Sequence, residues 1–346
     1  MQNDWATTLH SSGAVIMDDS VQHFGDPQHE SRAAAEGDVC ADLSHLGLLR
    51  AEGADTEGFL QGQLSNDVRL VDAGHSQLSA YCNPKGRMLA IVRLFKRDDA
   101  YFLQLPMALR EPTLKRLSMY VLRAKVTLRA EADLIGVGVS GPNATSLVEN
   151  LCGACTHEVD SSRTQAGITV IRLPGRLPRY ALFGSAAILQ PLWQQLKTTT
   201  TPVGAHAWRW LDIQAGLPTV LPETVEEFVP QMANLDLVGG VNFKKGCYPG
   251  QEIVARMHYL GRLKQRMIGA HVECATRPLP GTSVYAADFP DQSAGKVVDA
   301  QPAPAGGYDL LAVVQTSSVA KGDIHLNDLQ GPALQLTTLP YPLPPA

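Results

Sequence analysis

The most distinctive stretch of this chain is Phe243-Lys244-Lys245-Gly246-Cys247-Tyr248-Pro249-Gly250-Gln251-Glu252, which continues as Ile253-Val254-Ala255-Arg256. Ten residues combine two cations, two glycines, a proline, a thiol, a phenol, an amide and a carboxylate, a mixture that neither a core strand nor a surface helix needs. Gly246 indicates backbone in a conformation that other residues avoid. Pro249 predicts the first position of a helix, with Gln251 to Arg256 as its body and Gly261 as its end.

Cys247 is the candidate reactive group of this stretch. The positive end of the predicted helix and the neighbouring Lys245 would both lower the pKa of the thiol and raise its thiolate fraction. Glu252 falls in the first helical turn, four residues ahead of Arg256. The alternative is a structural turn in which the cysteine is a small, inert, buried residue.

The pattern Lys-Gly-Cys-Tyr-x-Gly-Gln-Glu followed by Val-Ala-Arg resembles the signature of the YgfZ family. The resemblance implies the aminomethyltransferase-like fold, in which two α/β units and a β-barrel enclose a central channel. It also implies folate binding and a role in maintaining iron–sulfur enzymes, including enzymes that modify tRNA. It covers the chain from about residue 37 onward.

Composition excludes several classes of protein. The chain has 346 residues, of which 45% are hydrophobic and 18% charged, with a net charge of −5. Its length predicts two or three domains. The negative charge argues against direct nucleic-acid binding, which needs a strongly basic face. The sequence does not exclude a local basic patch, which would be formed by four cations of one segment: Arg256, Arg262, Lys264 and Arg266.

No targeting, membrane or metal-binding signal is visible. The N-terminus lacks a basic segment followed by an apolar run, and no stretch approaches the roughly 20 apolar residues of a membrane span. The six cysteines are scattered along the chain, which is typical of reduced thiols and not of a disulfide framework. We therefore expect a cytoplasmic, monomeric protein without a metal site. Cys152 and Cys155 have redox-motif spacing but lie late in a helix, where the dipole does not favour a thiolate.

Two successive β-α-β-β-α-β patterns follow an irregular N-terminal extension, residues 1–36. The elements expected in the first unit are strand 48–53, helix 54–64, strands 77–81, 89–95 and 101–105, helix 108–122 and strand 125–130. Those expected in the second are strand 134–139, helix 143–151, strands 168–173 and 180–183, helix 186–196 and a closing strand at 205–214. This repeat predicts a duplicated ferredoxin-like architecture.

From about Met267 the pattern changes to short β-like runs between Pro/Gly turns, which predicts a small all-β barrel. The runs are 268–272, 283–286, 294–299 and 310–314, and the Pro-rich end is expected to be extended and loosely held. The fold class is therefore α+β, with duplicated ferredoxin-like units and a C-terminal β-barrel around a central channel. The expected domains are 1–36, 37–131, 132–262 and 263–338, with a tail at 339–346.

Three further segments are candidates for the channel. Asn66 and Asp67 follow the first helix, although the segment from Gln61 to Val68 also fits a plain helix end. The turn from Asn83 to Arg87 carries two cations, fits an ordinary hairpin equally well, and suits an anion such as the glutamate tail of folate. The family also has Lys-Gly-Arg here, whereas true aminomethyltransferases have a catalytic aspartate in this vicinity.

The segment from Trp208 to Pro218 resembles the fold's Arg-x-x-x-Gly-x-Pro segment. Related transferases hold the pterin ring of folate with a glutamate, where this chain has Gln214. An amide still makes paired hydrogen bonds to a pterin edge, but it lacks the charge. The alternative is that this segment is only the end of a strand.

These observations predict a tetrahydrofolate-binding accessory protein that supports the assembly or repair of iron–sulfur enzymes through transient contacts. The alternatives are a folate-dependent aminomethyl or one-carbon transferase, and a pure interaction module. The residues expected to carry chemistry are Cys247 and Lys245. Those expected to contact folate are Lys85, Arg87, Asn66, Asp67, Arg209, Gln214, Gly246, Tyr248, Gly250, Gln251, Glu252 and Arg256.

Overall fold

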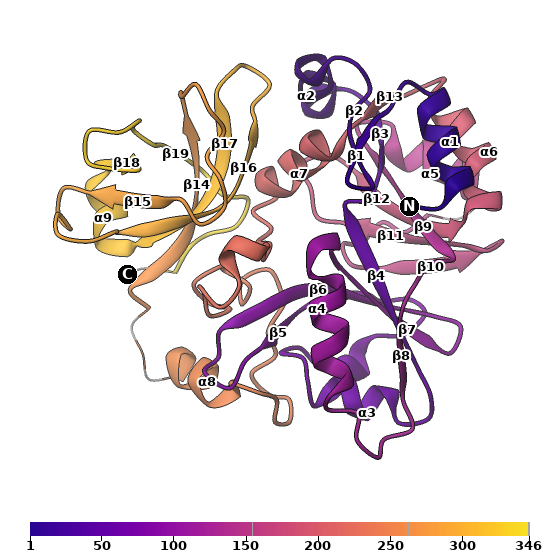
Figure 1. Ribbon diagram of the computed structural model, residues 1–346, viewed down its shortest axis with the longest axis horizontal. Helices are drawn as coiled ribbons and strands as arrows, with labels where there is room; N and C mark the ends of the chain where they lie inside the picture. Colours follow the sequence, from indigo (N-terminus) through magenta and orange to yellow (C-terminus); the bar gives the residue numbers. More distant parts are fainter. Residues whose placement is uncertain (154, 260, 262, 345–346) are drawn as a thin grey trace. The chain divides into compact units, whose positions relative to one another are not determined.

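The computed structural model describes residues 1–153, 155–259, 261 and 263–344 (Figure 1). Its contacts divide the chain into two compact units, each built from several segments. Unit 1 comprises Met1–Thr56, Arg69–Gln77 and Arg93–Leu211, and unit 2 comprises Glu57–Val68, Leu78–Val92 and Asp212–Ala346. The domain boundaries expected from the sequence stay a prediction.

The N-terminal segment is ordered, contrary to expectation. It forms α1 (Asn3–Ser11), β1 (Val15–Met17), β2 (Ser20–His23) and α2 (Pro27–Glu36). Trp5 and Leu9 are fully buried, and they lie four residues apart on one face of α1. The ring of Trp5 meets that of Trp193 edge-on at 5.6 Å between centroids. Two large apolar residues one turn apart are enough to dock this short helix, so the segment belongs to the core of unit 1.

The second repeat has the ferredoxin-like order with one inserted strand. Its elements are β9 (Leu134–Ser140), α5 (Ala144–Cys152), β10 (Ser162–Gln165), β11 (Ile168–Leu173), β12 (Arg179–Ser185), α6 (Ala186–Leu196) and β13 (Thr201–Val203). The sheet order is β10-β11-β12-β9-β3-β13, in which β3 (Val39–Asp42) separates β9 from β13. Without β3 and the edge strand β10, this is the order of a ferredoxin-like sheet.

The first repeat follows the same plan. Its elements are β4 (Leu46–Glu52), α3 (Thr56–Gln61), the 3-10 turn η1 (Val68–Leu70), β5 (Gln77–Cys82), β6 (Met88–Arg97), β7 (Ala100–Pro106), α4 (Met107–Ser118) and β8 (Thr127–Ala130). The sheet order is β5-β6-β7-β4-β8, with the additional strand β5 at one edge. Each repeat thus carries an extra edge strand at the equivalent place, and the predicted duplication is confirmed.

The closing strand of the second repeat was placed wrongly. Residues Ala205–Gln214 form helix α7, and β13 supplies the closing strand instead. Trp208 and Leu211 are both buried, three residues apart as on one face of a helix. The Trp208 ring lies so close to Gly138 of β9 that a Cβ there would come within 2.4 Å of it. The repeat pattern needs a closing strand, which is why one was predicted here, but the spacing of the buried residues is helical.

Aromatic stacking joins the two repeats within unit 1. Phe95 of β6 stacks on Phe102 of β7 with 5.3 Å between centroids, and on Phe183 of β12 with 4.8 Å. All three rings are at least 97% buried. Because one ring touches neighbours from both sheets, the two repeats share one core.

The C-terminal part of unit 2 is a curled six-stranded sheet of half-barrel shape (Figure 1). Its elements are β14 (Gln265–Val272), β15 (Ser283–Ala286), β16 (Gly295–Pro302), β17 (Tyr308–Gln315), α9 (Thr316–Lys321), β18 (Ile324–Leu326) and β19 (Gln335–Thr337), in the order β18-β15-β16-β17-β14-β19. The four predicted β runs are confirmed. The strands β18 and β19 were missed because three residues each are too few to show an alternating pattern.

The tail is anchored rather than loosely held. The hydroxyl of Tyr341 donates a hydrogen bond of 2.7 Å to the carbonyl oxygen of Gly216. Burial raises the pKa of Tyr341 to about 12. One buried phenol therefore fixes the Pro-rich segment to unit 2. In the described part of the chain, no helix has the length and apolar character needed to cross a membrane.

Candidate functional site

The turn between β5 and β6 is held in shape by one side chain. The Asn83 amide oxygen accepts hydrogen bonds from the backbone N–H groups of Lys85 (2.9 Å) and Arg87 (3.0 Å). Its amide nitrogen donates to Glu226 at 3.0 Å. The guanidinium of Arg87 donates to the carbonyl oxygen of Glu227, whereas Lys85 is exposed. Asn83 thus fixes the backbone from which both cations project.

The distinctive loop lies directly against this turn. Gly250 has φ +80°, and a Cβ on it would come within 2.5 Å of the Asn83 carbonyl oxygen and the Gly86 Cα. Gly86 has φ +72°, and its neighbour on the loop side is Ile253. Figure 1 shows α8 (Gln251–Tyr259) beside the tip of the β5–β6 hairpin. Two glycines with left-handed backbone therefore bring together segments about 165 residues apart in the sequence.

The sequence singled out the wrong glycine and an early helix start. Gly246 has an ordinary backbone conformation, and nothing lies within 4 Å of the position that its Cβ would take. Pro249 is not the first helical residue, because the left-handed Gly250 separates it from α8, which begins at Gln251. The helix body, Glu252 in its first turn and Arg256 in its last turn are as predicted. The predicted stop near Gly261 follows Leu260, which lies outside the described residues.

Lys245 anchors the loop from its N-terminal side. Its side chain is only 6% exposed, and its ammonium donates to the carbonyl oxygens of Gln61 and Leu64. The same ammonium lies 5.1 Å from the centre of the Tyr248 ring, a cation–π contact. The Gln251 side chain donates to the Lys245 carbonyl oxygen at 3.2 Å. A buried cation at the end of α3 stabilises the carbonyl dipoles there, so its first role is structural.

Asn66 and Asp67 are buried in the same network. The Asn66 amide donates to the carbonyl oxygens of Leu78 (2.9 Å) and Gly239 (2.7 Å). The Asp67 carboxylate accepts from Gln61 at 3.0 Å. These side chains cross-link the segment after α3 to β5, and contact with a ligand stays a prediction for them.

Gln214 at the end of α7 belongs to a chain of polar side chains. Its amide nitrogen donates to Asp309 at 3.0 Å, and the other oxygen of Asp309 lies 2.8 Å from Nδ1 of His271. Burial lowers the pKa of His271, but the hydrogen bonds to Asp309 and Glu273 outweigh it and the net shift is upward. Because Asp309 accepts, the amide nitrogen of Gln214 must face it. The amide oxygen is thereby directed away and available to accept.

Arg209 lies in unit 1, whereas the residues described above lie in unit 2. Burial lowers the pKa of His45 to about 3, with further contributions from the positive charges of Arg209 and Arg179. The structure therefore shows Arg209 acting on a neighbouring histidine. Its contact with a ligand stays a prediction.

Cys247 differs from the other five cysteines, all of which lie in the described part of the chain. It is exposed, whereas Cys155 and Cys274 are half-buried and the remaining three are buried. Burial raises the pKa of the thiols of Cys40, Cys82 and Cys152 to about 12. Of the two cysteines with redox-motif spacing, Cys152 therefore has a thiol that is protonated at neutral pH. The sequence predicts that the Lys245 charge favours the thiolate of Cys247. The structure weakens this prediction, because the Lys245 ammonium is buried against carbonyl groups.

We expect one equivalent of iodoacetamide at pH 8 to alkylate Cys247 ahead of the other five cysteines in the folded protein. Exposure and thiolate fraction control this reaction, and both are low for the buried thiols. Peptide mass spectrometry after short labelling checks it, with urea-unfolded protein as the control in which all six react. Faster labelling of Cys155 or Cys274 would contradict the assignment of Cys247 as the accessible thiol.

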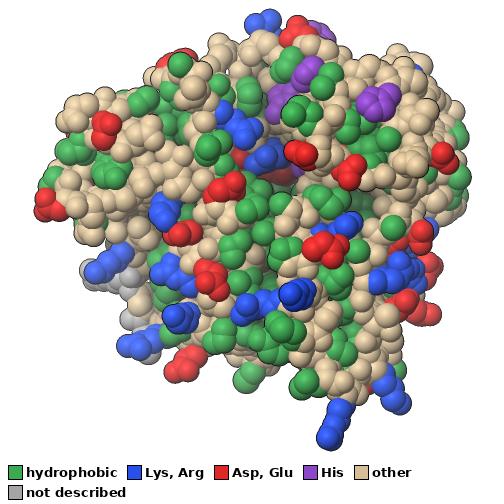
Figure 2. Space-filling model, viewed as in Figure 1, with side chains coloured by type: hydrophobic (Ala, Val, Ile, Leu, Met, Phe, Trp, Pro, Cys, Tyr) green, Lys and Arg blue, Asp and Glu red, His purple; other side chains and the backbone are tan. Residues whose placement is uncertain are grey.

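The expected basic patch is only partly present. Arg266 is paired with Asp236 through two hydrogen bonds of 2.7 and 3.0 Å, so its charge is compensated. Arg256 and Lys264 are exposed, and Arg262 lies outside the described residues. Figure 2 shows Lys and Arg side chains interspersed with Asp and Glu on the visible face.

Asp309 and His271 were missed by sequence reasoning. They lie on paired strands of the C-terminal sheet, where isolated polar residues carry no spacing signal. Asn83 was seen only as part of a turn, although asparagine commonly organises such turns by accepting from the backbone two residues on. Among the described residues, no group of three or more histidine, cysteine, aspartate or glutamate side chains is arranged to hold a metal ion.

Comparisons place this architecture among known proteins. Residues 18–245 match the family model for the GCVT N-terminal domain. The tRNA-modifying protein YgfZ of Colwellia psychrerythraea is 31% identical over 226 residues, which are 65% of this chain and 69% of that protein. The YgfZ of Photorhabdus laumondii is 28% identical over 303 residues, 87% of this chain and 92% of that one.

The fold is also that of a solved transferase. The glycine cleavage system aminomethyltransferase T from Bartonella henselae superposes with a TM-score of 0.80, covering 96% of each chain at 17% sequence identity. At that identity the similarity establishes the fold and leaves the chemistry to the site residues.

Proposed function

This chain belongs to the YgfZ family, and from that premise we propose that it is a reduced-folate-binding accessory protein. Its task would be to support the assembly or repair of iron–sulfur enzymes through Cys247. Because the curated relatives are called tRNA-modifying proteins, the proposed clients include iron–sulfur enzymes that modify tRNA. The observation that carries the proposal is the packing of Gly250 on the Asn83 turn, which holds an exposed thiol next to a cationic hairpin.

The residues present suit a reduced folate. The pterin ring of folate has N–H donors along one edge, and the Gln214 amide oxygen is free of hydrogen bonds to the residues that the structure describes. The exposed Lys85 offers a cation for the carboxylates of the glutamate tail. When bound, a reduced folate supplies one-carbon units or reducing equivalents. The protein's part would be to orient it with Gln214 and Lys85.

Cys247 would act toward the partner rather than toward the folate. The loop is fixed on one side of the thiol by the buried Lys245 and on the other by Gly250. A thiol held in place on a rigid loop loses little entropy when it meets a protein client. Its sulfur is a soft donor, suited to a transient contact with an iron–sulfur centre or to a reversible thiol exchange.

We expect Gln214→Ala to weaken tetrahydrofolate binding by roughly 1–3 kcal/mol, because a buried polar edge of the ligand is left without its partner. Titration calorimetry with tetrahydrofolate measures this loss. Gln301→Ala, which removes a buried amide from β16 instead, is the control and should leave the affinity unchanged. Equal losses in both variants would show that Gln214 acts only on the stability of the fold.

A folate-dependent aminomethyltransferase is the second candidate, favoured by the superposition on aminomethyltransferase T. The turn at Lys85-Gly86-Arg87 presents cations where those transferases have a catalytic aspartate, and a cation cannot act as a base. We therefore expect no aminomethyl transfer from an amine-loaded lipoyl carrier to tetrahydrofolate, measured as ammonia release. Robust turnover would replace the accessory role by the transferase.

A further inference from the structure

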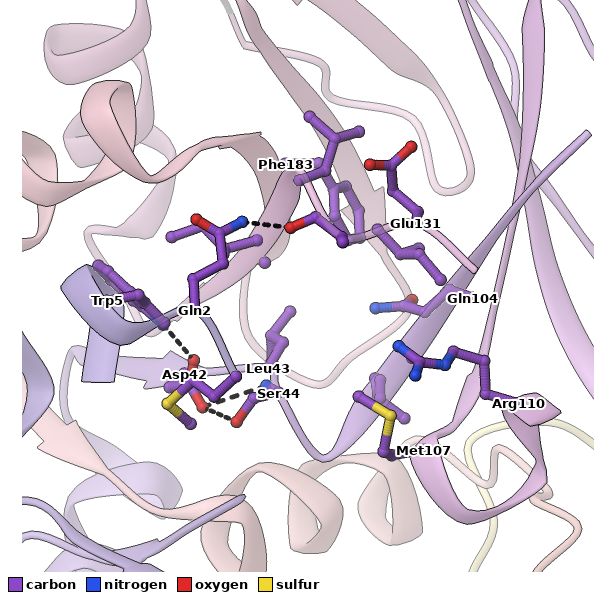
Figure 3. Close-up of a pocket in the computed structure, with 18 residues that line it drawn as sticks. Gln2, Trp5, Asp42, Leu43, Ser44, Gln104, Met107, Arg110, Glu131 and Phe183 are labelled. Carbon is purple, nitrogen blue, oxygen red and sulfur yellow. Dashed lines mark hydrogen bonds between the residues drawn. The ribbon is translucent and has the colours of Figure 1, made fainter. Parts of the chain in front are cut away.

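A cavity of about 290 Å³ lies within unit 1. It opens between the strands β4, β7 and β9 and is bordered by the first residues of the chain (Figure 3). Its apolar wall includes Trp5, Leu43, Leu48, Met107 and Phe183. A volume of this size is at the lower end of the range for small-molecule sites.

Arg110 enters the cavity because the facing strand has a glycine. A Cβ on Gly47 would come within 2.8 Å of the Arg110 Cδ, so the arginine stem lies directly over the Gly47 backbone. The Arg110 Nε is buried and has no hydrogen-bond partner among the described residues. Its only ion pair among those residues is with the exposed Glu111, at 3.2 Å. The inner edge of this guanidinium is therefore unused.

Gln104 supplies a second unused polar group. It lies on β7 opposite Leu48 of β4, and it is only 8% exposed. Its side-chain amide makes no hydrogen bond to any residue that the structure describes, and Figure 3 shows it pointing into the cavity on the same side as Arg110. A buried amide without a partner costs free energy of folding, which a ligand would recover.

Two acidic side chains border the cavity, and each has partners on the protein. The Asp42 carboxylate accepts from the Trp5 indole at 2.7 Å and from the backbone N–H and hydroxyl of Ser44. Burial raises the pKa of Asp42 and so favours its uncharged form. Oε1 of Glu131 accepts from the Asp133 N–H at 2.7 Å. Its Oε2 lies 3.6 Å from Arg129 and 3.9 Å from Arg50, but it accepts no hydrogen bond from the described residues. The ammonium of Met1 also borders the cavity, but it is paired with Asp19 at 3.1 Å. Arg110 is thus the lining cation that has a buried nitrogen without a partner among the described residues.

We propose that this cavity binds a small organic anion with an apolar body and a single carboxylate, held by Arg110 and Gln104. The planar guanidinium and the neighbouring amide both donate in a way that matches two carboxylate oxygens. Among the described residues, the Arg110 charge is offset only by the exposed Glu111, so it suits the single charge of a carboxylate better than a phosphate dianion. The apolar wall formed by Leu43, Leu48 and Phe183 accommodates the body of the ligand. This site is separate from the proposed folate site and does not depend on it.

The full-length protein with 3-phenylpropanoate as probe tests the proposal, and the neutral 3-phenylpropanamide is its matched control. Titration calorimetry should show saturable binding of the acid and at least roughly tenfold weaker binding of the amide. Arg110→Met and Gln104→Leu should each lose about tenfold or more in affinity for the acid. Lys115→Met removes an equal charge from the exposed face of the same helix and should change nothing.

The proposal is overturned by any of the following results: no binding of the acid up to 10 mM (about 2.7 kcal/mol of binding free energy), equal binding of acid and amide, or unchanged affinity in Arg110→Met. Circular dichroism and thermal melting show whether each variant is folded, and Gln104→Glu provides a second test at the same position. It keeps the shape of the side chain but repels a carboxylate, so it must also weaken binding of the acid. Displacement of the probe by tetrahydrofolate would mean one site instead of two and would likewise overturn it.

Discussion

Replacing Gly250 by alanine is expected to lower the free energy of unfolding by about 2–4 kcal/mol, since two independent costs combine. The residue has φ +80°, which an alanine adopts only with strain. Its Cβ would also come within 2.5 Å of backbone atoms of Asn83 and Gly86, which cannot rotate away as a side chain would. Urea unfolding followed by circular dichroism measures the loss.

Gly246→Ala is the matched control, since it makes the same chemical change four residues away in the same loop. Its Cβ would point into open space and its φ is ordinary, so we expect a change within about 0.5 kcal/mol. Because the contact of Gly250 lies between the loop and the hairpin, Gly250→Ala should also expose the Asn83 turn to proteolysis. Equal and small effects of the two substitutions would mean that the loop does not rest on the hairpin as described.

The contrast between these two glycines shows where sequence reasoning succeeds. The signature stretch and the turn at Asn83 were both found, because unusual residue mixtures and turn residues are local signals. Their contact was not found, because it depends on the φ of Gly250 and on a hairpin far away in the chain. Lys245 was likewise placed beside Cys247 by its position in the sequence, whereas its long side chain turns inward to the end of α3.

Helices and strands were predicted well where apolar and polar residues recur with a clear period, and poorly where that period is weak. The bounds of α6 and β15 are those predicted, since each has a clear period and flanking turn residues. Residues Ala205–Gln214 were predicted as a strand because the repeat plan needs a closing strand after the helix at 186–196. The helix α1 was missed because only Trp5 and Leu9 mark its buried face, too few for a periodicity.

We expect Cys247→Ser to abolish support of iron–sulfur client enzymes in cells while leaving tetrahydrofolate affinity within about 0.5 kcal/mol of the original. Serine has nearly the shape of cysteine, and Cys247 is exposed, so neither folding nor the proposed ligand contacts of Gln214 and Lys85 should change. The substitution removes only the soft sulfur donor. Complementation of a strain that lacks its own copy of this protein, read as client enzyme activity, measures the first effect, and calorimetry measures the second.

Cys274→Ser is the matched control for this prediction. Cys274 is half-buried, its thiol donates to the Thr276 carbonyl oxygen at 3.2 Å, and burial is the largest of the effects that raise its pKa. That variant should complement as well as the unaltered chain, because the Cys274 thiol is less exposed than that of Cys247 and burial raises its pKa. Two outcomes would contradict the proposal that Cys247 acts on client enzymes while Gln214 and Lys85 bind folate. One is full complementation by Cys247→Ser, which would leave the thiol without a role. The other is loss of tetrahydrofolate binding in that variant, which would make Cys247 part of the folate site itself.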